Sequence, residues 1–187
     1  WTGVPGVVAG FLSFGQKDTY TFTLSADKQF YFDTLTDNSR LRWNLVGPRG
    51  TVVSDRSMQS SDSADGTSIF NLPKGEYRLW IDGQGDATGD YGFRLIDLAG
   101  ATPLALDTTV TGQLLPANET DAFRINVTAG DRLFFDATAA DGGVPYWRLV
   151  DPFGNTVWGP SYMPSDNVPL QTMAFTGAYT LLVEGQR

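Results

Sequence analysis

An internal repeat with a spacing of about one hundred residues is the feature that most constrains how this chain can fold. Its strongest block, WNLVGPRGTVV at 43–53, returns as WRLVDPFGNTV at 147–157 with Trp, Leu-Val, Pro and Gly at the same internal spacing. Such a repeat predicts two copies of one module, which we place at residues 1–101 and 102–187. Four further blocks recur in the same order: 7–12 with 109–114, 18–24 with 121–127, 30–36 with 133–139, and 75–83 with 177–185.

The repeated blocks alternate apolar and polar residues, as a half-buried strand requires. Tyr20, Phe22 and Leu24 would share one face of a strand, with threonines on the other face. The turn sequences Gly-Pro-Arg-Gly at 47–50 and Asp-Pro-Phe-Gly at 151–154 join such blocks, because Pro fixes φ and Gly permits a positive φ. Many short strands with frequent turns predict an all-β fold of two tandem jelly-roll-like antiparallel β-sandwich modules.

The two copies end differently. The first copy continues after Gly83 with TGDYGFRLIDLA at 88–99, which has the alternation of another strand, and the second copy shows no counterpart before Arg187. We therefore expect the second module to lack its C-terminal strand. The simplest explanation is that the sequence is a piece of a longer chain. The alternative is that a partner or a following module supplies the strand by β-augmentation, and an open slot of this kind predicts strand-swapped self-association.

Composition excludes several classes of function. The formal net charge is −8, so the chain has no basic stripe for nucleic acid. No segment approaches the roughly 20 apolar residues that a membrane-spanning helix needs, so no membrane insertion is expected. The chain has no His and no Cys, which excludes Ser-His-Asp triads, Cys-His dyads, His-based zinc sites and disulfides. No pair of carboxylates stands out as a glycosidase site, and we predict that the chain is not an enzyme.

Five short motifs occur in order along the first copy: Y-x-F (20–22), F-Y-F-D (30–33), W-x-L-V-x-P-x-G (43–50), G-x-Y-x-L (75–79) and T-G-D-Y-x-F-R-L (88–95). Together they resemble the bacterial pre-peptidase C-terminal domain family and, more distantly, the collagen-binding domains of clostridial collagenases. The resemblance implies β-sandwich modules of a secreted or bacterial cell-surface protein, with neighbouring repeats of the same chain as partners. It does not identify a ligand, because one sandwich can carry unrelated sites.

Aspartates are the candidate metal ligands. Asp33 and Asp136 occupy matched positions at the ends of aromatic strands, where each could help to hold calcium or could cap the turn that follows. Asp82, Asp86 and Asp90 lie in Gly-rich loops of the first copy, but without the spacing of an EF-hand. Solvated loops are the alternative interpretation of these three residues. Calcium is the one cofactor that the sequence and the resemblance suggest.

Aromatic residues near a Pro-rich segment are the candidate ligand-binding residues. Trp158 and Tyr162 belong to WGPSYMP at 158–164, and Tyr146 lies on an earlier loop. Exposed aromatic rings stack on the apolar faces of sugars, so these three side chains are predicted to form a platform. Their alternative role is in packing.

Other tryptophans are predicted to be structural. Trp43 and Trp147 occupy matched positions inside apolar strands and should anchor the two cores. Trp80 would lie on the opposite face of its strand from the core residues, yet its counterpart is Leu182, which favours a second packed face there.

Three functions fit these patterns. The first is a non-catalytic pair of modules that act as adhesive, binding or spacer units of a large extracellular bacterial protein, with calcium as a candidate stabiliser. The second is a pair of carbohydrate-binding modules that recognise polysaccharide through loop aromatics. The third is an accessory unit that targets a secreted peptidase to its substrate. The expected partner is an extracellular polysaccharide or protein.

Overall fold

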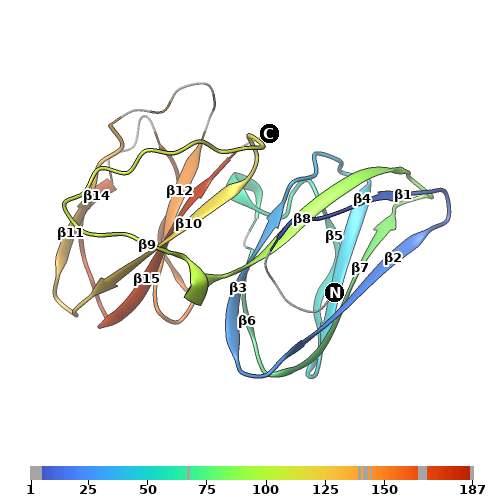
Figure 1. Cartoon of the computed structure of the whole chain (residues 1–187), viewed down its shortest axis with the longest axis horizontal. Coiled ribbons are helices and arrows are strands. Elements are labelled where there is room, and N and C mark those ends of the chain that lie inside the picture. The colour runs from blue at the N-terminus through green and yellow to red at the C-terminus, as the bar shows by residue number, and fades with distance from the viewer. Residues whose placement is uncertain are drawn as a thin grey trace. The chain divides into compact units, whose positions relative to one another are not determined.

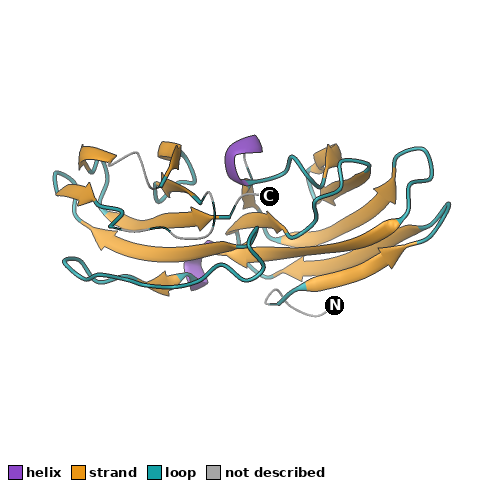
Figure 2. Cartoon of the chain, turned by 90° about the horizontal axis from the view of Figure 1, so that it is seen from above, coloured by secondary structure: helices purple, strands orange, loops and turns teal. Residues whose placement is uncertain are grey.

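The computed structural model describes residues 6–66, 68–138, 140, 143, 145–163 and 168–185. Its ordered elements are strands and two short 3₁₀ helices within these residues, η1 (Ser63–Asp65) and η2 (Leu98–Gly100) (Figure 2). The chain forms two compact units, Trp1–Asp97 and Leu98–Arg187. The predicted all-β sandwich fold is confirmed. In the part of the chain that the structure describes, neither helix has the length and apolar character needed to cross a membrane.

Unit 1 consists of two four-stranded antiparallel sheets (Figure 1). Sheet A has the order β1 (Val8–Leu12), β8 (Gly89–Asp97), β3 (Lys28–Thr34), β6 (Ile69–Leu72). Sheet B has the order β2 (Lys17–Leu24), β7 (Gly75–Gly83), β4 (Leu41–Gly47), β5 (Gly50–Ser57). Apart from the β4–β5 hairpin, consecutive strands lie in different sheets, as expected of a jelly-roll-like sandwich.

Aromatic side chains from both sheets form the core of unit 1. Phe32 of β3 stacks on Trp43 of β4 with ring centroids 3.7 Å apart, and on Phe93 of β8 at 5.4 Å. Trp43 Nε1 donates a hydrogen bond of 2.6 Å to Ser61 Oγ, so the polar atom of this buried ring is satisfied. Trp43 is therefore the core anchor that its place in the repeat predicted.

Unit 2 contains a five-stranded sheet and a two-stranded sheet. Sheet C has the order β13 (Thr156–Tyr162), β12 (Tyr146–Val150), β15 (Gly177–Glu184), β10 (Thr120–Val127), β9 (Thr102–Pro103), and sheet D pairs β11 (Arg132–Phe135) with β14 (Val168–Thr172). The short β9 pairs with β10 in parallel, whereas the other pairs are antiparallel. Trp147, Leu149 and Tyr179 are buried in the core between the sheets, as predicted for Trp147.

The last strand of unit 1 has no counterpart among the described residues of unit 2. In unit 1, β8 lies between β1 and β3 and pairs with both. In unit 2, β11 pairs only with β14 within the described part of the chain, and residues 109–114, which match β1 in sequence, are not in a strand. Among the described residues β1 pairs only with β8, so a unit without β8 also lacks the neighbour that would hold this segment as a strand.

Both copies retain a proline in a turn and a glycine at the start of a later strand, and the contact between these two residues explains why. A Cβ added to Gly75 would lie 2.8 Å from Pro48 Cγ, and a Cβ added to Gly177 would lie 2.8 Å from Pro152 Cγ. Both glycines also adopt φ values that L side chains rarely adopt, 141° and 153°. The β4–β5 and β12–β13 turns therefore pack against bare backbone at the start of β7 and β15.

We expect Gly75→Ala to lower the free energy of unfolding by about 2–4 kcal/mol, because backbone strain adds to a clash with the Pro48 ring. Gly50→Ala is the matched control: Gly50 has a φ of 103°, but a Cβ added there meets nothing within 4 Å. Gly50→Ala should lower the free energy of unfolding by about 1–2 kcal/mol, from backbone strain alone. Urea unfolding followed by tryptophan fluorescence measures both losses, and equal losses would mean that the contact with Pro48 has no energetic role.

Candidate functional site

The outer face of sheet B carries an aromatic ring among polar side chains. Trp80 of β7 lies directly between Thr19 of β2 and Asn44 of β4 in the strand register. Alternation along β7 directs Trp80 away from the core, which Leu79 and Ile81 enter. Trp80 is half-buried and Thr19 is exposed. Because Trp80 is only partly covered, the second packed face that we expected there stays a prediction.

Two cations lie against the Trp80 ring. Lys17 Nζ is 5.7 Å from the ring centroid, and Arg78 Cζ is 5.4 Å from it, distances at which the ring quadrupole attracts a cation. Lys17 also forms an ion pair of 3.0 Å with Asp82, in which both side chains are largely exposed. Such a pair contributes about 0–1 kcal/mol, so a ligand can displace it at little cost. Arg78 forms no ion pair with a described residue.

Two of the three residues of the predicted aromatic platform lie together. Tyr146 begins β12 and Tyr162 ends β13, so both lie in strands and the loop predicted for Tyr146 was wrong. The two residues are opposite each other in the strand register, and their ring centroids are 6.0 Å apart at an interplanar angle of 53°. Both side chains are half-buried. The two rings therefore lie side by side on one face of sheet C.

Trp158 does not join this pair. Its ring packs in the core of unit 2, with centroids 5.2 Å from Phe135 and 5.4 Å from Trp147. Regular alternation would place Trp158 on the same face as Tyr162, but the β12–β13 register shifts by one residue between Trp147 and Leu149. A shift of one residue moves a side chain to the other face of a sheet.

The matched aspartates have different surroundings. Asp33 is buried and accepts a hydrogen bond of 2.6 Å from Arg94 Nε of β8, so its carboxylate serves an ion pair inside unit 1. Asp136 is exposed at the end of β11. The difference follows from β8, because the strand that brings Arg94 to Asp33 has no described counterpart beside Asp136.

The remaining candidate metal ligands do not converge. Asp82 pairs with Lys17 and also accepts a hydrogen bond of 2.9 Å from the Gly83 N–H, while Asp86 and Asp90 are exposed. Within the described ranges, no three acidic side chains come close enough to hold a metal ion. Calcium binding therefore stays a prediction, without a described ligand cluster to support it.

A buried phenol links the two sheets of unit 1. The Tyr91 hydroxyl of β8 donates a hydrogen bond of 2.5 Å to Asp18 Oδ2 of β2 and contacts the Tyr20 hydroxyl. Burial, together with the hydrogen bond to Asp18, raises the pKa of Tyr91 well above its ordinary value. The phenol therefore stays protonated and acts as a structural donor. In the sequence, the sign of this hydrogen-bond network is Tyr91, which lies in the block at 88–99 that only the first copy contains.

Comparisons with known proteins give a distant likeness in fold. No protein-family model matches the chain, and no curated protein matches its sequence. Among solved structures, the CUB1-EGF-CUB2 domains of rat MASP-1 align with a TM-score of 0.32 and 10% identity over 100% of this chain and 94% of that chain. The CUB1-EGF-CUB2 domain of human MASP-1/3 aligns with a TM-score of 0.30 and 10% identity over 96% and 94% of the two chains. Likeness at this level assigns neither a family nor a function.

The two aspartates provide a matched pair of substitutions. We expect Asp33→Asn to lower the free energy of unfolding by about 1–3 kcal/mol, because it leaves the partly buried Arg94 without its carboxylate. Asp136→Asn, at the matching position of unit 2, should leave stability unchanged. Thermal and urea unfolding of both variants measure the difference, and equal effects would contradict a stabilising role for the Asp33–Arg94 pair.

Proposed function

We propose that the chain is a pair of non-catalytic binding modules of a secreted or cell-surface bacterial protein, and that unit 1 binds an extended polysaccharide on the outer face of sheet B. The observation that carries this proposal is the Trp80 ring, which lies on an open strand face with Lys17 and Arg78 against it. The absence of His and Cys from the sequence supports a role without catalysis.

The face has the chemistry for a sugar polymer. The half-buried indole of Trp80 can stack on the apolar face of a pyranose ring, while the hydroxyl of Thr19 and the amide of Asn44 can form hydrogen bonds with the hydroxyls of the sugar. Arg78, which forms no ion pair within the described residues, provides donors for a carboxylate. A strand face suits a chain-like ligand better than a small molecule, because small-molecule sites are concave.

The charge of the protein narrows the ligand further. A formal net charge of −8 repels a dense polyanion at long range. Screening limits that repulsion to about 8 Å at physiological ionic strength. At contact distance the interaction with the ligand therefore depends on the two cations beside Trp80. We therefore favour a polysaccharide that carries carboxylates on some of its sugars, rather than a highly sulfated one.

One observation favours a second sugar-binding site, on unit 2. Tyr146 and Tyr162 lie side by side on sheet C, with ring centroids 6.0 Å apart and no lysine or arginine stacked on either ring among the described contacts. This pair would suit a neutral sugar. The motif resemblance to pre-peptidase C-terminal domains supports the extracellular setting and leaves targeting of a secreted peptidase as the other role for such binding.

Affinity electrophoresis in gels that contain polygalacturonate tests the proposal. We expect the polymer to retard the wild-type chain, and Trp80→Ala to weaken binding by roughly tenfold, the loss of a stacking contact worth about 1.4 kcal/mol. Arg78→Ala should weaken binding by about threefold to tenfold, with a smaller salt dependence.

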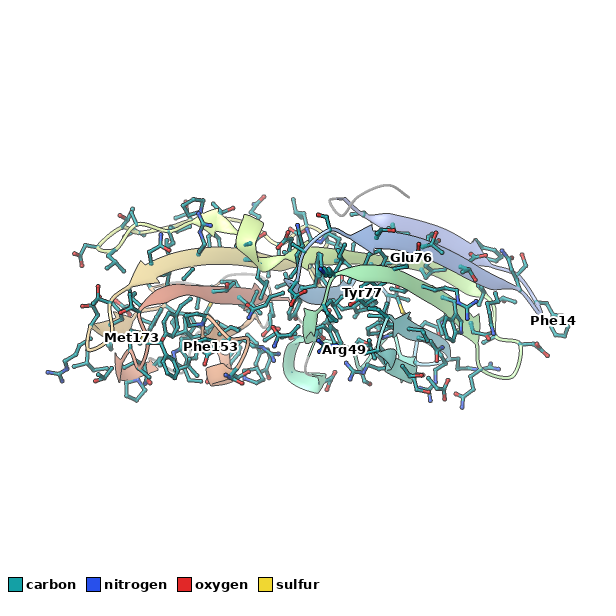
Figure 3. The ribbon with its side chains drawn as sticks, turned by 90° about the horizontal axis from the view of Figure 1, so that it is seen from below. Phe14, Arg49, Glu76, Tyr77, Phe153 and Met173 are labelled. Atoms are coloured by element: carbon teal, nitrogen blue, oxygen red, sulfur yellow. The ribbon has the colours of Figure 1, made fainter. Side chains whose placement is uncertain are left out.

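Two controls separate this site from the others. Arg49→Ala removes a cation of the same kind from the exposed β4–β5 turn (Figure 3) and should leave binding unchanged. Tyr162→Ala reports on the tyrosine pair and should affect a neutral glucan instead. Wild-type affinity in Trp80→Ala would rule out the outer face of sheet B as the binding site.

A further inference from the structure

One edge of sheet D is open in the described structure. The strand β11 pairs with β14 on one side and with no described strand on the other, whereas β3, its counterpart in unit 1, pairs with β6 and β8. The matching side chains of β3 and β11 also differ in exposure. Tyr31 of β3 is buried, and Phe134, at the matching position of β11, is 58% exposed. An unpaired edge with exposed apolar side chains is a template for another strand.

Unit 2 retains in its sequence the residues that contact β8 in unit 1. Gly10 of β1 lies so close to β8 that an added Cβ would be 2.5 Å from the Tyr91 hydroxyl, and Tyr91 donates to Asp18. The matching residues of unit 2 are Gly112 and Asp121. Among the described residues, a Cβ added to Gly112 would meet only Asp121 Oδ2, at 4.0 Å, so no described side chain packs against Gly112 as the Tyr91 ring packs against Gly10.

Charge complementarity also favours an added strand at the unpaired edge of β11. In unit 1 the register of β3 and β8 places Asp33 opposite Arg94, and the two side chains form an ion pair of 2.6 Å. Asp136, the match to Asp33, is exposed and forms no ion pair with a described residue. A strand that occupied the position of β8 in unit 2 would place its sixth residue, the position of Arg94 in β8, beside this carboxylate. A basic side chain would be favoured there.

We propose that unit 2 is an acceptor for a β-strand from outside these 187 residues, which adds antiparallel to β11 and has the chemistry of β8. The incoming strand carries apolar residues on alternate positions toward the core, a tyrosine that reaches Asp121 beside Gly112, and an arginine opposite Asp136. This site is separate from the polysaccharide face of unit 1. Main-chain hydrogen bonds provide affinity and the alternate side chains provide specificity, as in other β-augmentation complexes.

The β8 strand of a second copy is not the occupant. Tyr91, Phe93 and Leu95 of β8 are all buried in their own unit. Their removal would expose in the donor the same kind of apolar surface that they would cover in the acceptor, and would open an equal slot there. An exchange of this kind gains no contacts, so the favoured donor is a strand that is not already paired.

A peptide with the sequence of residues 88–99, TGDYGFRLIDLA, is a direct probe of the acceptor slot. We expect the fluorescein-labelled peptide to bind the 187-residue chain saturably in fluorescence anisotropy, and Asp136→Arg to weaken binding by roughly tenfold or more. A peptide with Arg94→Glu should bind the wild-type chain equally weakly and recover most of its affinity for the Asp136→Arg chain. Glu76→Arg, the same change of charge on an exposed residue of unit 1 (Figure 3), should leave binding unchanged.

Disulfide cross-linking tests the register, because the chain itself contains no cysteine. Tyr31 is opposite Ile96 in unit 1, so Phe134→Cys in the chain should cross-link to a peptide with Ile96→Cys. A peptide with Arg94→Cys places its thiol two residues away and should cross-link at least about fivefold less.

Three results would overturn the proposal. The first is no binding of the peptide at millimolar concentration. The second is binding that Asp136→Arg does not weaken or that cross-links equally at both cysteines. The third is concentration-dependent dimerisation of the chain in sedimentation that Phe134→Arg abolishes, because a second copy would then occupy the edge.

Discussion

Every strand of a β-sandwich needs a neighbour for its backbone hydrogen bonds. In unit 1, β8 pairs with β1 on one side and with β3 on the other, and β3 also pairs with β6. Strand β8 also brings Tyr91 to Asp18 across the sandwich and Arg94 to the buried Asp33. Backbone pairing, core packing and two polar contacts therefore depend on one segment. In unit 2, the described residues show the consequence of its absence: a two-stranded sheet D, and no strand at 109–114.

The outer surface of sheet B shows how a repeat can retain a scaffold and differ in function. The residues that both units share are core tryptophans, turn prolines and the glycines on which those prolines pack. Trp80 is not shared, because unit 2 has Leu182 at that position, and Arg78 is replaced by Thr180. The cation–aromatic group on sheet B thus belongs to unit 1 alone. The tyrosine pair of unit 2 arises from an equally unshared segment.

Periodicity and turn chemistry predicted most of the strands and the core tryptophans, because both are local consequences of alternation and of Gly-Pro placement. They did not predict β6 or β14, and the block at 109–114, which repeats β1, is not a strand. The platform of Tyr146, Trp158 and Tyr162 was predicted only in part. A one-residue register shift between β12 and β13 directs Trp158 into the core, and residue spacing along one strand contains no information about its register with the next. Asp33 and Asp136 have similar sequence contexts, yet only Asp33 is buried. The difference comes from β8, whose Arg94 lies about sixty residues further along the chain and pairs with Asp33.

Amide hydrogen exchange tests most directly whether β8 holds its two neighbours in place. Backbone amides of β1 and of β3 should exchange slowly in unit 1, close to the rate set by global unfolding of that unit. Amides at 109–114, and those of β11 that do not bond to β14, should exchange faster by several orders of magnitude, because no strand accepts their hydrogen bonds among the described residues. Protection of 109–114 equal to that of β1 would contradict the dependence of these segments on β8.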